Sequence, residues 1–450
     1  MFGLSHNAGL LLSTAVAVAG LLLLIARFKF NSFVALILAS MFVGLTSGMK
    51  LADVAKSFQD GVGAVLGSIA VVVGLGTILG KLLAESGGAQ VVARTFIDGW
   101  GEKRLPWTMM IVGFIVGIPV FFSVGLVLLF PILVTVVRRS KRRMLELGIP
   151  LVAGLSVVHG LVPPHPGPMV AIELLKADAG KTILYALLVG FPTAIIAGPL
   201  FGKYIARRVP AELTGSLADQ LGQPNEHRRP PGFALTLFTI LLPVILMLGA
   251  SALDVTLGKE NSWRQWGDFL GSPIVALLIA LLFSLYSFGF ARGFDRDQIL
   301  KFTNDCLAPV ATTLLVVGAG GGFNKVLVAS GVGDAIAALA RSSHVSPLLL
   351  GWFVAALIRV ATGSATVAIA TATGILAPIA AATPGVNLEL LVLAMGAGSL
   401  ILSHVNDGGF WFVKEYFNLS LPQMLKTWTV METIIAIVAL AFIMALSMVV

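Results

Sequence analysis

Four ionisable side chains interrupt apolar stretches of this sequence. The stretch "SHVNDGGFW" contains His404 and Asp407, and the stretch "HGLVPPHPGP" contains His159 and His165. Carboxyl and imidazole groups can bind and release protons, and imidazole does so near physiological pH without much tuning. We therefore expect proton coupling at Asp407, with His159 and His404 as alternatives, while His165 is a candidate ligand or a further proton carrier.

A cation and several hydroxyl groups form a second set. Arg359 is the only charged residue between Gly351 and Pro384, and it precedes the hydroxyl-rich stretch "TGSATVA". A guanidinium group can bind a carboxylate through two hydrogen bonds, and free N–H groups at a helix break suit an anion. Two alternatives stay open, namely a salt bridge that braces the fold and hydroxyls bonded to their own helix. The candidate substrate-binding residues are Ser123, His165, Arg359, Thr362, Gly363, Ser364, Thr366 and Asn406.

The composition places these residues in a membrane. Of the 450 residues, 57% are hydrophobic and 12% are charged, whereas soluble domains have about 25% charged residues. Many apolar runs are long enough to cross a bilayer as a helix. The basic residues behind the net charge of +8 lie in short loops such as 136–147, which is typical of cytoplasmic loops and does not indicate nucleic-acid binding. The sequence therefore predicts an all-α polytopic membrane protein.

Twelve apolar segments are arranged in two sets of six. A polar, proline-bearing stretch flanked by arginine pairs separates the sets and predicts a cytoplasmic linker at 207–232, between repeats at 1–206 and 233–450. The segments are 9–26, 31–48, 61–84, 107–137, 147–172 and 181–206, then 233–253, 270–291, 305–328, 348–383, 388–412 and 427–449.

Two of the segments are predicted to enter and leave on the same side of the membrane. Alternation of basic loops puts both ends of segment 107–137 inside. A straight helix of that length would span about 46 Å, too long for one crossing and too short for two. A re-entrant hairpin fits both facts, and the same count places both ends of segment 348–383 outside.

The two sets are predicted to be inverted copies. "VVGLGTILGKLLAESG" (72–87) aligns without gaps on "VVGAGGGFNKVLVASG" (316–331), with a constant offset of 244 positions. Each repeat is expected to have about five transmembrane helices plus one re-entrant helical hairpin, with broken helices at the midplane. This design is common in secondary transporters, whose sites lie where half-helices end.

Four breaks interrupt the apolar segments, and each is a candidate site because irregular backbone at membrane depth must line protein or a watery cavity. Gly117 and Pro119 break the first hairpin, and Gly363 breaks the second. Four prolines between Pro163 and Pro168 are expected to end the helix that enters from Ile149. Gly408 and Gly409 are expected to end the corresponding helix of the second repeat.

An enzymatic alternative is weaker. "GVGD" (331–334) matches a pattern of intramembrane aspartyl proteases, but Asp334 follows its helix and its repeat counterpart is Gln90. The single Cys306 excludes an internal disulfide and has no metal-binding signature. We therefore expect no enzyme activity, cofactor or metal. The ionisable residues within the apolar stretches, such as Asp407 and His159, are treated as functional candidates because an ionisable group within the membrane is costly.

The patches "GIPVFFSVGLVLLFPI", "HGLVPPHPGPM", "TGSATVA" and "SHVNDGGFW", together with the layout of the whole chain, resemble the gluconate permease family of bacterial inner-membrane proton symporters. The resemblance implies uptake of gluconate or a related hydroxy acid with a proton, and a mobile domain that carries the hairpins against a scaffold, as in the wider ion transporter superfamily. The partners would be a small anionic sugar acid, a proton and the lipid bilayer, with a homodimer left open.

The substrate is expected between the hairpin tips and the two broken segments. Several alternatives stay open on sequence grounds. The substrate could be glycerate, fructuronate, idonate or D-serine, or a dicarboxylate carried with sodium, although two carboxylates would call for more cations than Arg359. A passive channel would lack the dependence on protons.

Overall fold

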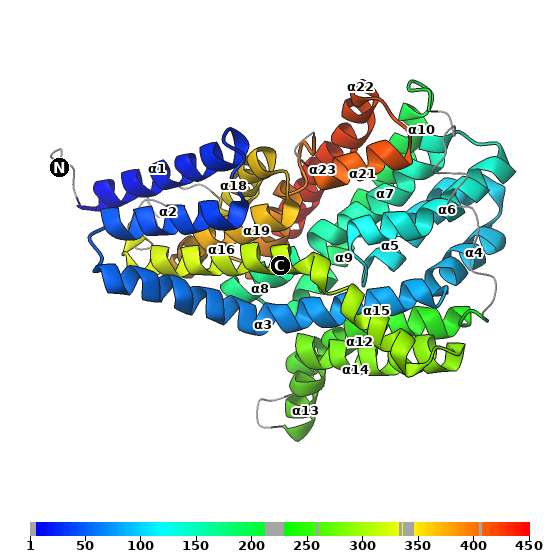
Figure 1. Cartoon of the computed structure of the whole chain (residues 1–450), viewed down its shortest axis with the longest axis horizontal. Helices are drawn as coiled ribbons and strands as arrows, with labels where there is room; N and C mark the ends of the chain where they lie inside the picture. The colour runs from blue at the N-terminus through cyan, green and yellow to red at the C-terminus, as the bar shows by residue number, and fades with distance from the viewer. Residues whose placement is uncertain (1–5, 212–228, 258–260, 333–334, 336–345, 405–406) are drawn as a thin grey trace.

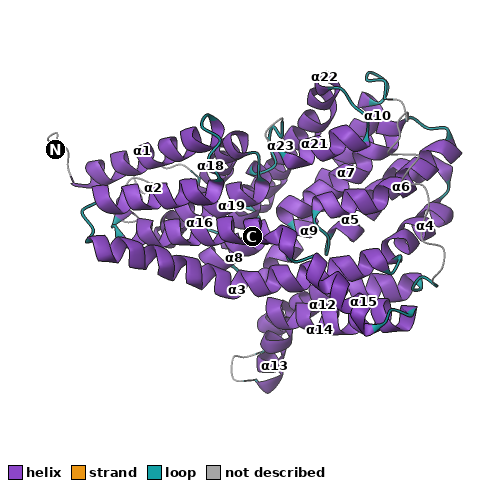
Figure 2. Cartoon of the chain, viewed as in Figure 1, coloured by secondary structure: helices purple, strands orange, loops and turns teal. Residues whose placement is uncertain are grey.

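The computed structural model describes residues 6–211, 229–257, 261–332, 335, 346–404 and 407–450. These residues are helical apart from short connections, with no strand among them (Figure 2). Eight of the described helices are long and apolar enough to cross a membrane, or nine if the bent helix α6 counts as one span. The predicted all-helical, multi-span fold is confirmed.

The first repeat contains the broken elements in the middle of its chain (Figure 1). Four residues separate α5 from α6, and four separate α7 from α8. Its helices are α1 (His6–Ala26), α2 (Ser32–Thr46), α3 (Leu51–Glu85), α4 (Gly88–Trp100), α5 (Leu105–Gly117), α6 (Phe122–Ser140), α7 (Met144–Leu161), α8 (Pro166–Leu175), α9 (Ala179–Ile195), the π-helical turn η2 (Ile196–Leu200) and α10 (Phe201–Ile205), with a 3₁₀ turn η1 (Glu102–Arg104) before α5.

The second set also has two breaks, between α18 and α19 and between α20 and α21, and the second of these is longer than its counterpart. Its helices are α12 (Phe233–Thr256), α13 (Ser262–Gly271), α14 (Pro273–Ser284), the turns η3 (Leu285–Gly289) and η4 (Phe290–Arg292), α15 (Arg296–Asp305), η5 (Ala308–Val310), α16 (Ala311–Ala329), α18 (Pro347–Thr362), α19 (Ala365–Ala382), α20 (Leu388–Gly398), α21 (Gly408–Tyr416), α22 (Leu421–Met424), η6 (Leu425–Thr429) and α23 (Val430–Leu446).

The offset of 244 positions recurs in the structure. α3 and α16 end in the same way, with the serine hydroxyls of Ser86 and Ser330 bonded to their own helix and with Gly87 and Gly331 both at φ +76°. α7 and α20 also begin 244 positions apart, at Met144 and Leu388. These matches support the predicted internal repeat, which remains a prediction. The inverted orientation of the copies, and the division at 207–232, remain predictions.

The hairpins and broken helices pack in a reciprocal pattern. α5 runs along α7, as α18 runs along α20. The other half of each hairpin packs within its own set and also contacts the opposite one: α19 packs on α8 as well as on α16 and α18, and α6 makes a smaller contact with α21 beside its contact with α7. These contacts bring all four breaks toward the middle of the bundle.

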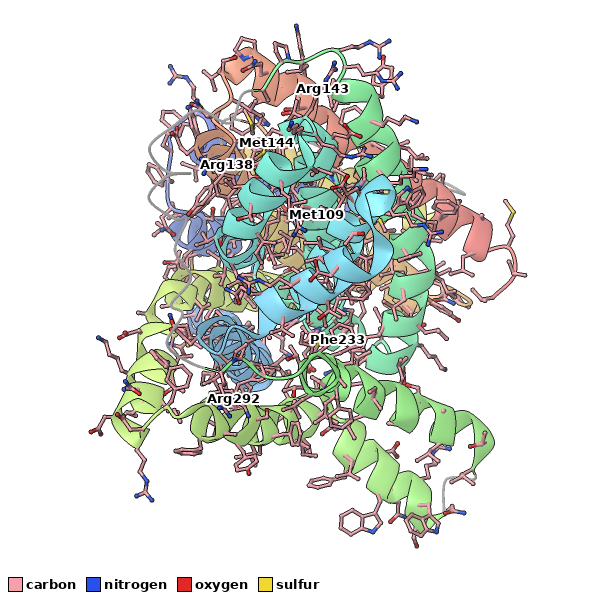
Figure 3. The ribbon with its side chains drawn as sticks, turned by 90° about the vertical axis from the view of Figure 1, so that its right-hand side faces the viewer. Met109, Arg138, Arg143, Met144, Phe233 and Arg292 are labelled. Carbon is pink, nitrogen blue, oxygen red and sulfur yellow. The ribbon has the colours of Figure 1, made fainter. Side chains whose placement is uncertain are left out.

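Loops that the charge pattern assigns to one side of the membrane are bonded to one another. Arg143 Nη1 donates to the Ala206 carbonyl at 2.8 Å, and both residues lie in loops expected inside. On the opposite side, the Asp178 amide donates to Glu389 Oε1 at 3.0 Å. Figure 3 looks at the end of the molecule that lies at the right in Figure 1 and shows Arg143 and Arg292 there, although they come from different repeats.

Among the described residues, α4, α13, α15 and α22 lie largely outside the predicted apolar segments, and α3 is longer than predicted. α4, α13 and α15 are short helices with polar residues, and α13 projects from the body of the molecule (Figure 1). α3 begins at Leu51, ten residues before the predicted start at 61. Hydropathy alone does not detect such segments, because one polar face lowers their mean hydropathy without preventing helix formation.

One predicted helix end is wrong. Gly408 and Gly409 do not end the entering helix, which stops at Gly398, but form the first turn of α21. Asp407 is the N-cap of α21, and its side chain accepts from the Gly409 amide at 2.8 Å. An aspartate before two glycines is a helix-start signal, which outweighs the helix-ending tendency of glycine.

The close approach of α5 and α7 depends on two glycines. A Cβ atom built on Gly113 would lie closer than 3.0 Å to the Leu151 carbonyl oxygen, and one on Gly154 would crowd the Met110 carbonyl oxygen in the same way. Both obstacles are backbone atoms, so they cannot move aside as a side chain would.

We expect Gly113→Ala and Gly154→Ala each to destabilise the protein by about 1–3 kcal/mol through overpacking. Thermal unfolding in detergent, followed by size-exclusion chromatography, would measure the loss. Gly20→Ala in α1 is the matched control, because nothing lies within 4 Å of its Cβ position. Equal melting temperatures for all three variants would show that the α5–α7 contact tolerates a methyl group.

Candidate functional site

The predicted cation and the predicted proton carrier meet in an ion pair. Arg359 lies in the last turn of α18, and Asp407 precedes α21. Arg359 Nη2 and Asp407 Oδ2 are 2.5 Å apart, with the two side chains 4% and 13% exposed. Sequence analysis proposed Arg359 as a substrate-binding cation and Asp407 as a proton carrier. The fold brings these two residues together although they are 48 positions apart in the sequence. The salt-bridge alternative for Arg359 therefore describes its contact in this conformation.

Asp407 has further hydrogen bonds. Ser403 donates its hydroxyl to Asp407 Oδ2, and Trp428 Nε1 donates to the Ser403 hydroxyl at 2.7 Å. Thr429 Oγ1 donates to the Ser403 carbonyl at 2.5 Å. The second break is thus attached to η6, and the Asp407 carboxylate is held by Arg359, Ser403 and the Gly409 amide. Sequence analysis did not identify Ser403 or Trp428.

The first break brings two histidines to the same region. His159 lies in the last turn of α7 and His165 caps α8, and their ring centroids are 5.1 Å apart. His165 Nε2 donates to the Gly117 carbonyl at 2.8 Å, which ties the first break to the first hairpin. His159 and His165 thus form a polar pair at the first break, and Arg359 of the second hairpin lies close enough to act on His159 electrostatically.

The His404 side chain forms a hydrogen bond within its own turn of the chain. Its Nδ1 donates to the Leu402 carbonyl at 2.7 Å, and the ring is partly exposed. This local bond supports the turn before Asp407, whose amide donates to the His404 carbonyl at 2.9 Å. The structure shows no side-chain bond between His404 and the Arg359–Asp407 pair.

The hairpin tips show local bonding. Gly363 ends α18 at φ +73°, in the left-handed region that glycine adopts without strain. The Ser364 amide donates to Thr362 Oγ1 at 3.4 Å, and Ser364 Oγ accepts from the Val367 amide at the start of α19. Thr366 is buried in the first turn of α19.

Ser123, a predicted substrate-binding residue of the first hairpin, is partly buried in the first turn of α6. Asn406, and the aspartate of the protease-like pattern at Asp334, lie outside the described residues.

A small pocket with a cavity volume of about 20 Å³ lies beside the first break. Its walls come from the glycine-bearing part of α3, the tip of the first hairpin and the turn before α8. The residues that line it are Val72, Val73, Gly76, Thr77, Ile118, Pro119, Phe121, Pro164, His165 and Pro166. His165 therefore lies in the wall of this pocket and 5.1 Å, ring to ring, from His159.

Several buried polar atoms in this region lack a hydrogen-bond partner among the described residues. They include Arg359 Nε, His159 Nδ1 and both carboxyl oxygens of Glu432 in α23. Buried polar groups are nearly always bonded, so each exception calls for an explanation. Sequence analysis missed Glu432, although a signal was present, because it is the only acidic residue in the predicted segment 427–449.

Comparison with known proteins identifies the family. The family model for GntP family permeases matches residues 9–449. This chain belongs to the GntP family of permeases. It is 55% identical over 449 residues to the gluconate permease of Pseudomonas aeruginosa, covering 100% of both chains. It is 42% identical over 443 residues to the high-affinity gluconate transporter of Escherichia coli, covering 98% of this chain and 100% of that one.

The permease also resembles solved transporters in fold. The crystal structure of the Alcanivorax borkumensis YdaH transporter superposes with a TM-score of 0.66 at 17% identity, covering 92% of this chain and 96% of that chain. The family membership and the apolar spans show a multi-pass protein of the inner membrane that is a permease and not an enzyme. The suspected family resemblance is confirmed.

Proposed function

We propose that this permease imports gluconate, or a closely related sugar or hydroxy acid, together with a proton. The substrate class rests on the gluconate relatives, which match over the full length of the chain. Other members of the family are an L-idonate transporter and a D-serine transporter of Escherichia coli. All three substrates carry a carboxylate and at least one hydroxyl group, which matches the cation and the hydroxyl side chains of the site.

The observation that carries the proposal is the buried Arg359–Asp407 pair. Gluconate is a monoanion, and its carboxylate needs a cationic partner inside the bundle. Arg359 is engaged by Asp407 in this conformation, while its Nε–H has no acceptor among the described residues. A proton on Asp407 would remove the competing negative charge, so that Arg359 could bind the substrate carboxylate. One proton and one monoanion then enter together without adding net charge.

The substrate would lie between the hairpin tips and the two broken segments. His165, Ser123 and Asn406 would offer hydrogen bonds there, as would Thr362, Gly363, Ser364 and Thr366 at the second tip. His159 and His404 are alternative proton carriers. The reciprocal packing of the hairpins on the broken helices supports an elevator-like step, in which these elements move together with their substrate past the rest of the bundle.

The test is uptake of labelled gluconate into proteoliposomes that contain the purified protein. An imposed pH gradient, acidic outside, is expected to drive accumulation above the external concentration, and unlabelled L-idonate and D-serine would measure selectivity as competitors. A collapsed gradient is the control. Uptake that follows a sodium gradient and ignores protons would refute the proton coupling, and absence of any gluconate uptake would refute the substrate.

A further inference from the structure

Glu432 is a buried carboxyl group that the proposed function does not use. It is 1% exposed and lies near the middle of the continuous helical span Leu421–Leu446. Neither carboxyl oxygen has a hydrogen-bond partner within 3.5 Å among the described residues, so the nearby Ser156 hydroxyl of α7 makes at most a long contact with this carboxyl group. An ionised carboxylate without donors is very costly to bury. The environment of Glu432 therefore favours its protonated form, the carboxylic acid, over the carboxylate.

The groups that face Glu432 come from three elements. Arg359 of α18 and Asp407 at the start of α21 act on it electrostatically, and the Ser156 hydroxyl of α7 lies near it. The other helices packed on α23 carry their ionisable residues away from the middle of the span, because Lys181 and Glu389 lie in the first turns of α9 and α20. η6 and α9 also carry Lys426 and Tyr185, which are exposed and partly buried.

The carboxyl groups of Asp407 and Glu432 differ in the hydrogen-bond donors around them. Asp407 accepts hydrogen bonds from Arg359, Ser403 and the Gly409 amide, which suits a charged carboxylate. Glu432 has none of these donors. Two neighbouring carboxyl groups whose environments favour different protonation states can divide the roles of proton donor and acceptor.

We propose that Glu432 is the residue that holds the coupling proton in this conformation and supplies it to Asp407. The inference rests on the proposed function, because it assigns a role within proton-coupled uptake. As the proton passes from the Glu432 carboxylic acid to the Asp407 carboxylate, Glu432 takes up another proton from solution and is not left ionised. Protonation of Asp407 frees Arg359 for the substrate anion, so the cycle takes up one net proton with each monoanion.

The experiment compares two transport modes of Glu432→Gln in proteoliposomes. Glutamine keeps the shape of the protonated side chain but cannot release a proton. We expect accumulation driven by a pH gradient to fall at least about tenfold, in line with the loss of a positioned proton-transfer group. Counterflow exchange of labelled for unlabelled gluconate moves no net protons and should stay within about threefold of the wild type. Glu432→Asp should recover part of the gradient-driven accumulation.

Matched controls separate the outcomes. Glu415→Gln removes an exposed carboxylate paired with Lys414 and should leave both modes unchanged. Wild-type protein without gluconate uptake would refute the proposed function itself. Wild-type coupling together with normal gradient-driven accumulation by Glu432→Gln would refute only the role of Glu432. Equal loss of accumulation and counterflow in Glu432→Gln would also refute it, since the residue would then serve folding or substrate binding.

Discussion

Arg359→Gln is expected to abolish gluconate binding and uptake. Arg359 is the only cation in the sequence between Gly351 and Pro384, and its side chain is 4% exposed. Truncating one partner of a buried, hydrogen-bonded charge pair costs about 2–5 kcal/mol, so gluconate affinity should fall by at least about thirtyfold. Isothermal titration calorimetry on protein in detergent would measure the affinity, and proteoliposome uptake would measure transport.

A stability cycle separates substrate binding from structural support. Arg359→Gln and Asp407→Asn should each lower the melting temperature, because each leaves a buried charge without its partner. The double variant should recover stability without recovering transport. Arg296→Gln, which removes an exposed cation at the start of α15, is the matched control. Transport by the double variant at the wild-type rate would show that the pair only braces the second hairpin.

Asp407→Asn is expected to uncouple transport from the proton gradient. Asparagine resembles the protonated aspartate: its Oδ1 can still accept from the Gly409 amide, while its Nδ2 takes the place of Asp407 Oδ2 and can donate to the Ser403 hydroxyl. Arg359 is then permanently available to the substrate. We expect gluconate counterflow to persist, while accumulation driven by a pH gradient falls by about a hundredfold, as for loss of a positioned proton-transfer group.

The pH dependence of counterflow and a double variant test the role of Asp407 in proton coupling further. The counterflow rate of Asp407→Asn should no longer fall as the pH is raised, because no proton is needed to release Arg359. If Asp407 and Glu432 serve one proton path, the double variant Asp407→Asn/Glu432→Gln should be no worse than Asp407→Asn, since effects on a shared path are not additive. Undiminished, pH-driven accumulation by Asp407→Asn would contradict the role of Asp407.

Sequence reasoning singled out most of the ionisable residues of the candidate site for one physical reason. Ionisable groups are rare in apolar spans because they are costly there, so Asp407, Arg359, His159 and His165 stand out. The same reasoning could have found Glu432, the only acidic residue of the last segment. Breaks in the helices do not point to Glu432, because it lies within the continuous span Leu421–Leu446.

The partners of these groups could not be derived from spacing. Arg359 and Asp407 lie in different elements, and Ser403 and Trp428 join them only because α21 returns beside η6. The role of Gly408 and Gly409 was also misassigned, since a glycine pair is compatible with either a helix end or a helix start. The side chain of Asp407 decides between them by accepting the Gly409 amide.

The sequence by itself determined the all-helical membrane fold, the positions of both hairpin breaks and the offset between the repeats. These features follow from hydropathy, charge alternation and backbone chemistry, which act locally along the chain. The tertiary structure decided which buried charges neutralise each other. Packing within the second set of helices places Arg359 beside Asp407, which also accepts from Ser403 and the Gly409 amide, whereas none of these groups bonds to Glu432. The cost of a buried charge depends on such donors rather than on residue type.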